Sequence, residues 1–115
     1  VSVCTPPEIH YDQVKSCLAA GLHVLCEKPF VLNSSVDNSG RAVELIEIAK
    51  KQGRIVTVNT QWPSVLRLIR PFVNMSEVKT FFMYTQPGVP GIGMLADHLP
   101  HANSMLVTLV PAGQP

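Results

Sequence analysis

The sequence is poor in charge, which limits the partners it is expected to have. Only 15% of its 115 residues are charged, and its 9 Lys and Arg residues are scattered along the chain, with a formal net charge of +1. Nucleic-acid binding depends on clustered basic residues that face phosphates. We therefore expect no nucleic-acid partner.

Long hydrophobic runs are also missing. No apolar run approaches the ~18 residues of a transmembrane helix, and no charged segment followed by an apolar stretch indicates a signal peptide. The sequence therefore predicts a cytoplasmic protein without membrane association. It begins with Val1 rather than Met and stops at a proline just after an apolar run, so we expect a piece of a longer protein.

Cysteine is scarce as well. Cys4, Cys17 and Cys26 are odd in number and form no C-x-x-C pair, which argues against a disulfide framework or a zinc ribbon. We expect each of them to be a small buried apolar residue in a reducing cytosol.

What the sequence does have is a hydrophobic fraction of 46%, which predicts a packed core. Short β-branched runs alternate with apolar residues at helical spacing. Strands are expected at 1–4, 23–30, 54–61 and 77–87, and helices at 10–21, 41–53, 63–72 and 94–110, the last one interrupted or started by Pro100. The first three strands are apolar nearly throughout, which favours parallel strands covered on both faces.

Polar residues follow the predicted parallel strands. Ligands of such sheets lie beyond the carboxyl ends of the strands, and these ends fall at Thr5-Pro6-Pro7, Glu27-Lys28-Pro29 and Asn59-Thr60-Gln61. We expect these segments to meet at one edge. A simpler interpretation, that Glu27 and Lys28 form a solvated strand end, stays open.

Residues 3–29, VCTPPEIHYDQVKSCLAAGLHVLCEKP, resemble part of the nucleotide-binding domain of the glucose-fructose oxidoreductase, inositol dehydrogenase and MocA (Gfo/Idh/MocA) family. The family pattern is a strand ending in Thr-Pro, a His, a helix closed by Ala-Gly, then His-Val and Glu-Lys-Pro. Its parts stand here as Thr5-Pro6, His10, Ala20-Gly21, His23-Val24 and Glu27-Lys28-Pro29. The resemblance is looser after residue 62, where DHLPH is similar to an Asp-x-x-x-His segment and maps onto Asp97 and His101.

The resemblance implies an α/β fold. Residues 1–62 would form the C-terminal half of a Rossmann-like doubly wound parallel sheet, and residues 63–115 a linking helix and the start of an α+β substrate domain. It also implies hydride transfer between NAD or NADP and a sugar, polyol or similar substrate, by a protein that is a homo-oligomer at full length. The alternatives are a non-catalytic sugar- or nucleotide-sensing module on the same fold and a purely structural domain.

Two departures from the family pattern stand out. The G-x-G-x-x-G phosphate loop is absent from the sequence, together with the residue that would select NAD or NADP. Relatives usually hold a glycine between the Asp and the His, where Leu99 and Pro100 stand here. We expect weak or no NAD(P)H binding by the isolated chain.

The resemblance assigns three catalytic residues. Lys28 would stabilise the developing alkoxide, His101 would act as the general base, and Asp97 would orient His101 or the substrate. Asp97 and His101 are four residues apart, which places them on one face of a helix. The alternative for Asp97 is a helix N-cap.

The remaining site residues are assigned to the cofactor. They are Thr5, Pro6, His10, Glu27 and Gln61, together with Lys28; His10 has the equal alternative of helping to start the helix. The Lys28-Pro29 bond is a candidate for the cis form. A metal site at Asp97, His98 and His101 lacks a fourth ligand, so no metal is predicted.

Overall fold

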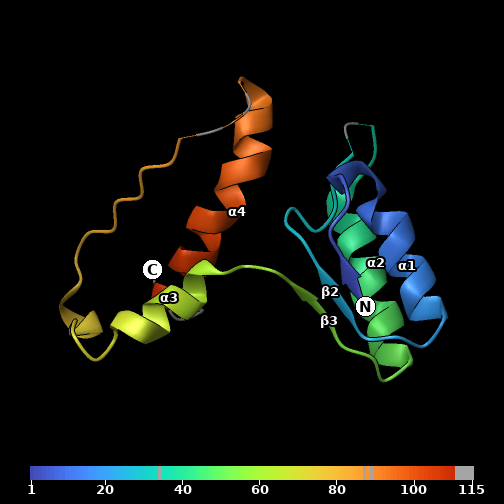
Figure 1. The fold of residues 1–115 in the computed structure, drawn as a ribbon, viewed down its shortest axis with the longest axis horizontal. Coiled ribbons are helices and arrows are strands. Elements are labelled where there is room, and N and C mark those ends of the chain that lie inside the picture. The colour runs from blue at the N-terminus through green and yellow to red at the C-terminus, as the bar shows by residue number, and fades with distance from the viewer. Residues whose placement is uncertain (34, 87, 89, 111–115) are drawn as a thin grey trace. The chain divides into compact units, whose positions relative to one another are not determined.

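The computed structural model describes residues 1–33, 35–86, 88 and 90–110 (Figure 1). The chain divides into two compact units, Val1–Asn59 and Thr60–Pro115. Each is described by itself.

The first unit contains a three-stranded parallel sheet. Its strands are β1 (Ser2–Val3), β2 (Val24–Cys26) and β3 (Val56–Val58), in the order β1-β2-β3. The short 3-10 helix η1 (Pro7–Ile9) and helix α1 (His10–Ala19) connect β1 to β2, and helix α2 (Asn38–Lys51) connects β2 to β3. The predicted α/β class and the parallel sheet are confirmed, although each strand is shorter than its apolar run.

The two helices end and begin where the sequence places the appropriate residues. Gly21 follows α1 at a φ of 72°, a conformation that glycine adopts without steric cost. Asp37 caps α2 by accepting a hydrogen bond from the backbone nitrogen of Ser39 at 2.9 Å. Lys50 and Lys51 occupy the last turn of α2, where cations interact favourably with the helix dipole.

The core of the first unit lies between the sheet and these helices, which pack side by side on one face (Figure 1). Its buried residues are Val3, Val14, Leu18, Val24, Cys26, Leu45 and Ala49. Ser2, Leu25 and Thr57 pair in register on the opposite face and are exposed. The prediction that both faces are covered is therefore wrong for the described residues, because both connecting helices pack on the same face.

The second unit is helical. Its elements are α3 (Trp62–Ile69), the short 3-10 helix η2 (Met75–Glu77) and α4 (Ile92–Leu109). Helix α3 packs against α4, and Leu66 and Met105 are buried in this unit. No helix in the described part of the chain is long and apolar enough to cross a lipid bilayer.

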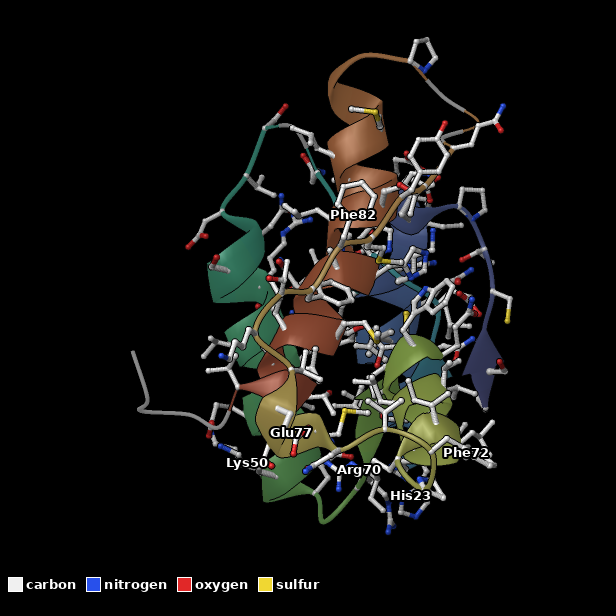
Figure 2. The ribbon with its side chains drawn as sticks, turned by 90° about the vertical axis from the view of Figure 1, so that its left-hand side faces the viewer. His23, Lys50, Arg70, Phe72, Glu77 and Phe82 are labelled. Atoms are coloured by element: carbon white, nitrogen blue, oxygen red, sulfur yellow. The ribbon has the colours of Figure 1, made fainter. Side chains whose placement is uncertain are left out.

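The strand predicted at residues 77–87 is wrong for its described part, because residues 78–86 form no strand. Their side chains nevertheless alternate in burial, as an extended chain requires: Phe81, Met83 and Thr85 are half-buried, and Phe82 (Figure 2) and Tyr84 are exposed. A strand needs a neighbour for its ladder of hydrogen bonds, and the described residues of this unit offer none. Residue 87 lies outside the described residues.

Pro100 does not interrupt α4, which continues through it from Ile92 to Leu109. The helix begins after Gly91, whose φ is 68°. Asp97 consequently lies inside the helix, and its alternative interpretation as an N-cap is wrong. The prediction that Pro100 marks a break or a start fails because the missing N–H costs one helical hydrogen bond without forcing the chain to end its helix.

Candidate functional site

The carboxyl ends of the three strands meet at one edge of the sheet, as predicted. Val3 pairs with Cys26, and Cys26 pairs with Val58. The backbone nitrogen of Glu27 donates to the oxygen of Val3 at 2.9 Å, and that of Asn59 donates to the oxygen of Cys26 at 2.7 Å. The segments that begin at Cys4, Glu27 and Asn59 therefore leave the sheet side by side.

Glu27 is tied to the neighbouring strand. The Asn59 side-chain nitrogen Nδ2 donates to Glu27 Oε1 at 2.5 Å, and both side chains are partly buried. A carboxylate fixed in this way holds two strand ends together. The contact gives Glu27, which the sequence assigns to the cofactor, a structural role at this edge.

Lys28 follows β2 at this edge and is partly buried. The bond between Lys28 and Pro29 is cis, as predicted. A primary ammonium at the ligand-binding edge of a parallel sheet suits an oxygen that gains negative charge during a reaction.

His10 is the first residue of α1, and its side chain is fully buried. Its Nδ1 lies 2.9 Å from the carbonyl oxygen of Pro29, and its Nε2 lies 2.8 Å from the carbonyl oxygen of Thr5. The ring therefore contacts the segments that follow β2 and β1 at the same time.

The other residues assigned to a cofactor lie at the loops of this edge and beyond it. The Thr5 hydroxyl donates to Gln13 Oε1 at 2.7 Å, and the Thr5 carbonyl oxygen lies 2.8 Å from His10 Nε2. Pro6 is exposed and precedes η1. Gln61 belongs to the second unit, where it is the exposed N-cap residue of α3.

The cysteines differ in their surroundings. Burial and the neighbouring Glu27 carboxylate raise the pKa of the Cys26 thiol to about 11, so this sulfur stays protonated and unreactive near neutral pH. Cys17 is half-buried, but Cys4 is exposed, which makes the prediction of its burial wrong. Cys4 directly follows β1, which is an edge strand of the sheet.

In the second unit, α4 carries an acidic residue and two histidines close together. The Asp97 carboxylate oxygen Oδ2 lies 3.3 Å from His98 Nε2. The rings of His98 and His101 are 6.2 Å apart between centroids and inclined at 76°. The structure thus adds His98 to the pair that the sequence singled out.

Trp62 completes this cluster from α3. Its ring lies edge-on to that of His101, with 6.1 Å between centroids. Within the described residues, Trp62 Nε1 and His98 Nδ1 are buried without a hydrogen-bond partner. The sequence predictions named His98 only in the rejected metal site and did not assign Trp62 to any site. The signals were nevertheless present, since His98 is next to Asp97 and Trp62 directly follows the Asn59-Thr60-Gln61 segment.

An apolar cavity of about 190 Å³ lies beside His98. Its walls come from α4 and from the extended segment before it: Met83, Thr85, Met94, Leu95, His98, Leu99 and Ala102. Among the described residues, no three His, Cys, Asp or Glu side chains are grouped so that they could hold a metal ion.

The chemistry of the sheet edge fits one half of a dinucleotide. Lys28 suits the reacting end of such a ligand, where a cation is useful. Pro6 has no backbone N–H and offers only a carbonyl oxygen. A pyrophosphate needs a glycine-rich turn at a helix N-terminus. No G-x-G-x-x-G turn joins a strand to a helix in the described part of the chain, and the glycines at the start of α4 follow no strand.

Comparison with known families matches residues 1–60 to a family described as "Oxidoreductase family, NAD-binding Rossmann fold" (GFO_IDH_MocA). These residues make up more than half of the chain and include every strand of the sheet. The match contains the whole sheet edge described above.

Individual relatives agree with this family. An uncharacterized oxidoreductase of Schizosaccharomyces pombe, C26H5.09c, is 43% identical over 58 residues, which cover 50% of this chain and 14% of that protein. The D-glucoside 3-dehydrogenase of Escherichia coli is 38% identical over 56 residues, covering 49% of this chain and 14% of the enzyme. The chain thus matches about one-seventh of the length of each of these two relatives.

Two relatives extend over the second unit. The uncharacterized oxidoreductase YdgJ of Escherichia coli is 29% identical over 126 residues, which cover 95% of this chain and 35% of that protein. The crystal structure of a Klebsiella pneumoniae protein proposed to be an oxidoreductase matches 100% of this chain and 33% of its own, with 28% identity and a TM-score of 0.67.

Proposed function

Because the chain belongs to the Gfo/Idh/MocA oxidoreductase family, we propose that it is part of an enzyme that transfers hydride between NAD or NADP and a sugar, polyol or similar substrate. The observation that carries this proposal is the sheet edge. Three parallel strands bring the segments at Thr5, Lys28 and Asn59 together, and the family match includes all of them.

NAD or NADP, when bound, accepts or returns the hydride. In our proposal Thr5 and Pro6 approach the cofactor through their backbone, Lys28 through its ammonium, and Gln61 through its amide. Glu27 acts by holding the edge together, since its carboxylate is engaged by Asn59. The burial of His10 limits it to contacts with the backbone on which the cofactor would rest.

Lys28 is proposed to stabilise the substrate oxygen as it gains negative charge. An ammonium placed before the reaction begins requires little reorganisation in the transition state. Lys28 is partly buried at the edge, and reduced contact with water strengthens such an interaction.

His101 is proposed to take the proton from the substrate hydroxyl. Histidine suits proton transfer near neutral pH. The Trp62 ring packs against His101 and limits its orientations, while Asp97 interacts with the adjacent His98. We propose that His98 and Asp97 maintain the charge and orientation of this cluster.

The substrate class is supported by the relative that acts as a D-glucoside 3-dehydrogenase. A substrate with several hydroxyl groups also suits side chains of these two kinds, because an ammonium and an imidazole can each form a hydrogen bond with a hydroxyl group. We further propose that the full-length protein is a homo-oligomer and has no nucleic-acid partner.

The test is an assay of the full-length protein with NAD⁺ and with NADP⁺, using methyl β-D-glucoside, D-glucose and myo-inositol as probes. Formation of NADH or NADPH with at least one probe is the expected result. Cofactor binding without turnover on any sugar or polyol would favour the alternative, a sensing module. Absence of cofactor binding would contradict the proposed enzyme.

A further inference from the structure

The proposed reaction gives no direct role to His10, the only fully buried polar side chain among the described residues. We infer that His10 is a positioning residue: it holds together the segments that follow β1 and β2, and in this way fixes the backbone beside Lys28. The inference deepens the proposed function and rests on it for the role of Lys28.

The geometry of the His10 ring carries this inference. Nδ1 lies 2.9 Å from the oxygen of Pro29, and Nε2 lies 2.8 Å from the oxygen of Thr5. Both distances are within the range of an N–H···O hydrogen bond. The ring therefore spans the gap between two loops that leave adjacent strands.

The chemistry of the two partners strengthens the case. Carbonyl oxygens only accept hydrogen bonds, so the ring must be the donor in any hydrogen bond that it forms with them. A doubly protonated ring donates to both oxygens, and a neutral ring donates to one of them. In either state at least one loop carbonyl is held by a buried ring N–H, which is costly to leave unpaired.

Lys28 lies between two anchored neighbours. Before it, Glu27 is held by the backbone oxygen of Val3 and by the side chain of Asn59. After it, the carbonyl of Pro29 is held by His10. If the anchor at Pro29 is removed, the segment after β2 keeps the anchor at Glu27, and we expect the position of the Lys28 backbone, and with it the surroundings of its ammonium, to change.

The His10 side chain is not accessible to a ligand. Its exposed fraction is 0%, and both ring nitrogens face backbone oxygens. Its contribution to a reaction must therefore pass through the loops that it contacts.

The test uses the full-length protein with three variants. His10→Leu removes both contacts, and His10→Gln retains an N–H donor. His23→Gln is the matched control, because His23 (Figure 2) is an exposed histidine of the same sheet that accepts a hydrogen bond from the Ile55 nitrogen at 3.0 Å. It precedes β2, at the opposite end of that strand from Lys28.

The first measurement is the rate at which acetic anhydride labels each lysine, followed by mass spectrometry. Lys28 is expected to be labelled faster in His10→Leu than in the wild type. This increase should exceed the variation in labelling rate that Lys50 and Lys51 show between the two proteins. The rate should return toward the wild-type value in His10→Gln and be unchanged in His23→Gln. A purely structural role for His10 would leave Lys28 labelling unchanged in the folded variants.

Wild-type labelling of Lys28 in folded His10→Leu would overturn the inference. If that variant does not fold, His10→Gln decides, because glutamine carries its donors on one nitrogen instead of on two separated ring nitrogens. Labelling of Lys28 that is faster than in the wild type supports the inference, and a rate equal to that of the wild type overturns it. The second measurement is kcat/KM with the probe that the assay above identifies, expected to fall by up to about 100-fold in His10→Leu. Absence of turnover in the wild type would count against the proposed function alone, since the labelling result does not depend on activity.

Discussion

The side-chain nitrogen of Asn59 donates a hydrogen bond to Oε1 of Glu27 at 2.5 Å, and so joins the ends of β3 and β2. The two residues are 32 positions apart in sequence. Their contact fixes the carboxylate that directly precedes Lys28. The presence of Glu27 in the family's Glu-Lys-Pro segment is thus explained by its hydrogen bond with Asn59, which directly follows the adjacent strand β3.

Replacing Glu27 with Ala is expected to lower the free energy of unfolding by about 1–3 kcal/mol, because a partly buried amide loses a charged acceptor. Urea unfolding of the full-length protein measures the change. Glu47→Ala is the control, since Glu47 pairs with Lys50 on the exposed surface of α2, where such pairs contribute little. Equal unfolding curves for both variants would contradict the structural role of Glu27.

Replacing Lys28 with Met is expected to lower kcat/KM by about 100-fold or more, because the transition state loses its cation. Initial rates of NADH or NADPH formation give the value, and circular dichroism verifies the fold. Lys50→Met, which removes an exposed lysine from α2, should retain the wild-type rate. A Lys28→Met enzyme with normal kcat/KM would remove Lys28 from the mechanism.

The surface cluster of Tyr11, Lys15 and Glu44 predicts a dependence of stability on pH. Lys15 Nζ lies 2.7 Å from Glu44 Oε1, and the Tyr11 hydroxyl donates to Oε2 at 2.6 Å. These two hydrogen bonds, that of Lys15 first, hold the pKa of Glu44 below its ordinary value of 4.5. The same carboxylate and Tyr11 raise the pKa of Lys15, so Lys15 stays charged through the acid and neutral range.

A lowered pKa means that the ionised Glu44 carboxylate stabilises the folded state above pH 4.5 and that this contribution is lost as the pH falls through the lowered value. The difference in unfolding free energy between the wild type and Glu44→Gln should therefore shrink below pH 4.5, and also in high salt. Urea titrations from pH 3 to pH 7 (about the range over which carboxylates titrate) test this. Glu8→Gln serves as the exposed control, and a constant difference across the range would refute the prediction.

Replacing Pro100 with Ala is expected to raise the free energy of unfolding, by up to about 3 kcal/mol, because α4 regains a backbone donor in its interior. Since the helix already continues through Pro100, the positions of Asp97 and His101 should be retained and kcat should change little. Thermal unfolding and steady-state rates measure the two effects. A large loss of kcat together with higher stability would show that the proline itself places His101.

Much of the first unit was predictable because its determinants are local. Apolar β-branched runs gave the three strands, and Asp37 and Gly21 lie at the ends of helices that the spacing of apolar residues predicts. The cis Lys28-Pro29 bond was also predictable, since only bonds that precede proline readily adopt this form.

The predictions failed where a structure depends on a partner elsewhere in the chain. Residues 78–86 have the alternating pattern of a strand, but an isolated pattern has no ladder to join. Leu25 is an apolar residue in the middle of β2, so the sequence predicts that a helix covers it. Both helices of its unit pack on the opposite face, and Leu25 is 42% exposed.

The sequence by itself determined the order of strands and helices in the first unit and the edge at which Thr5, Lys28 and Asn59 emerge, because side-chain periodicity and the parallel arrangement follow from near neighbours along the chain. Only the tertiary structure decided that His10 reaches Thr5 and Pro29, that Glu27 accepts from Asn59, and that Trp62 packs on His101. Apart from the contact between His10 and Thr5, which are five positions apart, these contacts join residues distant in sequence. Their distances depend on strand register and helix packing, which residue order alone does not specify.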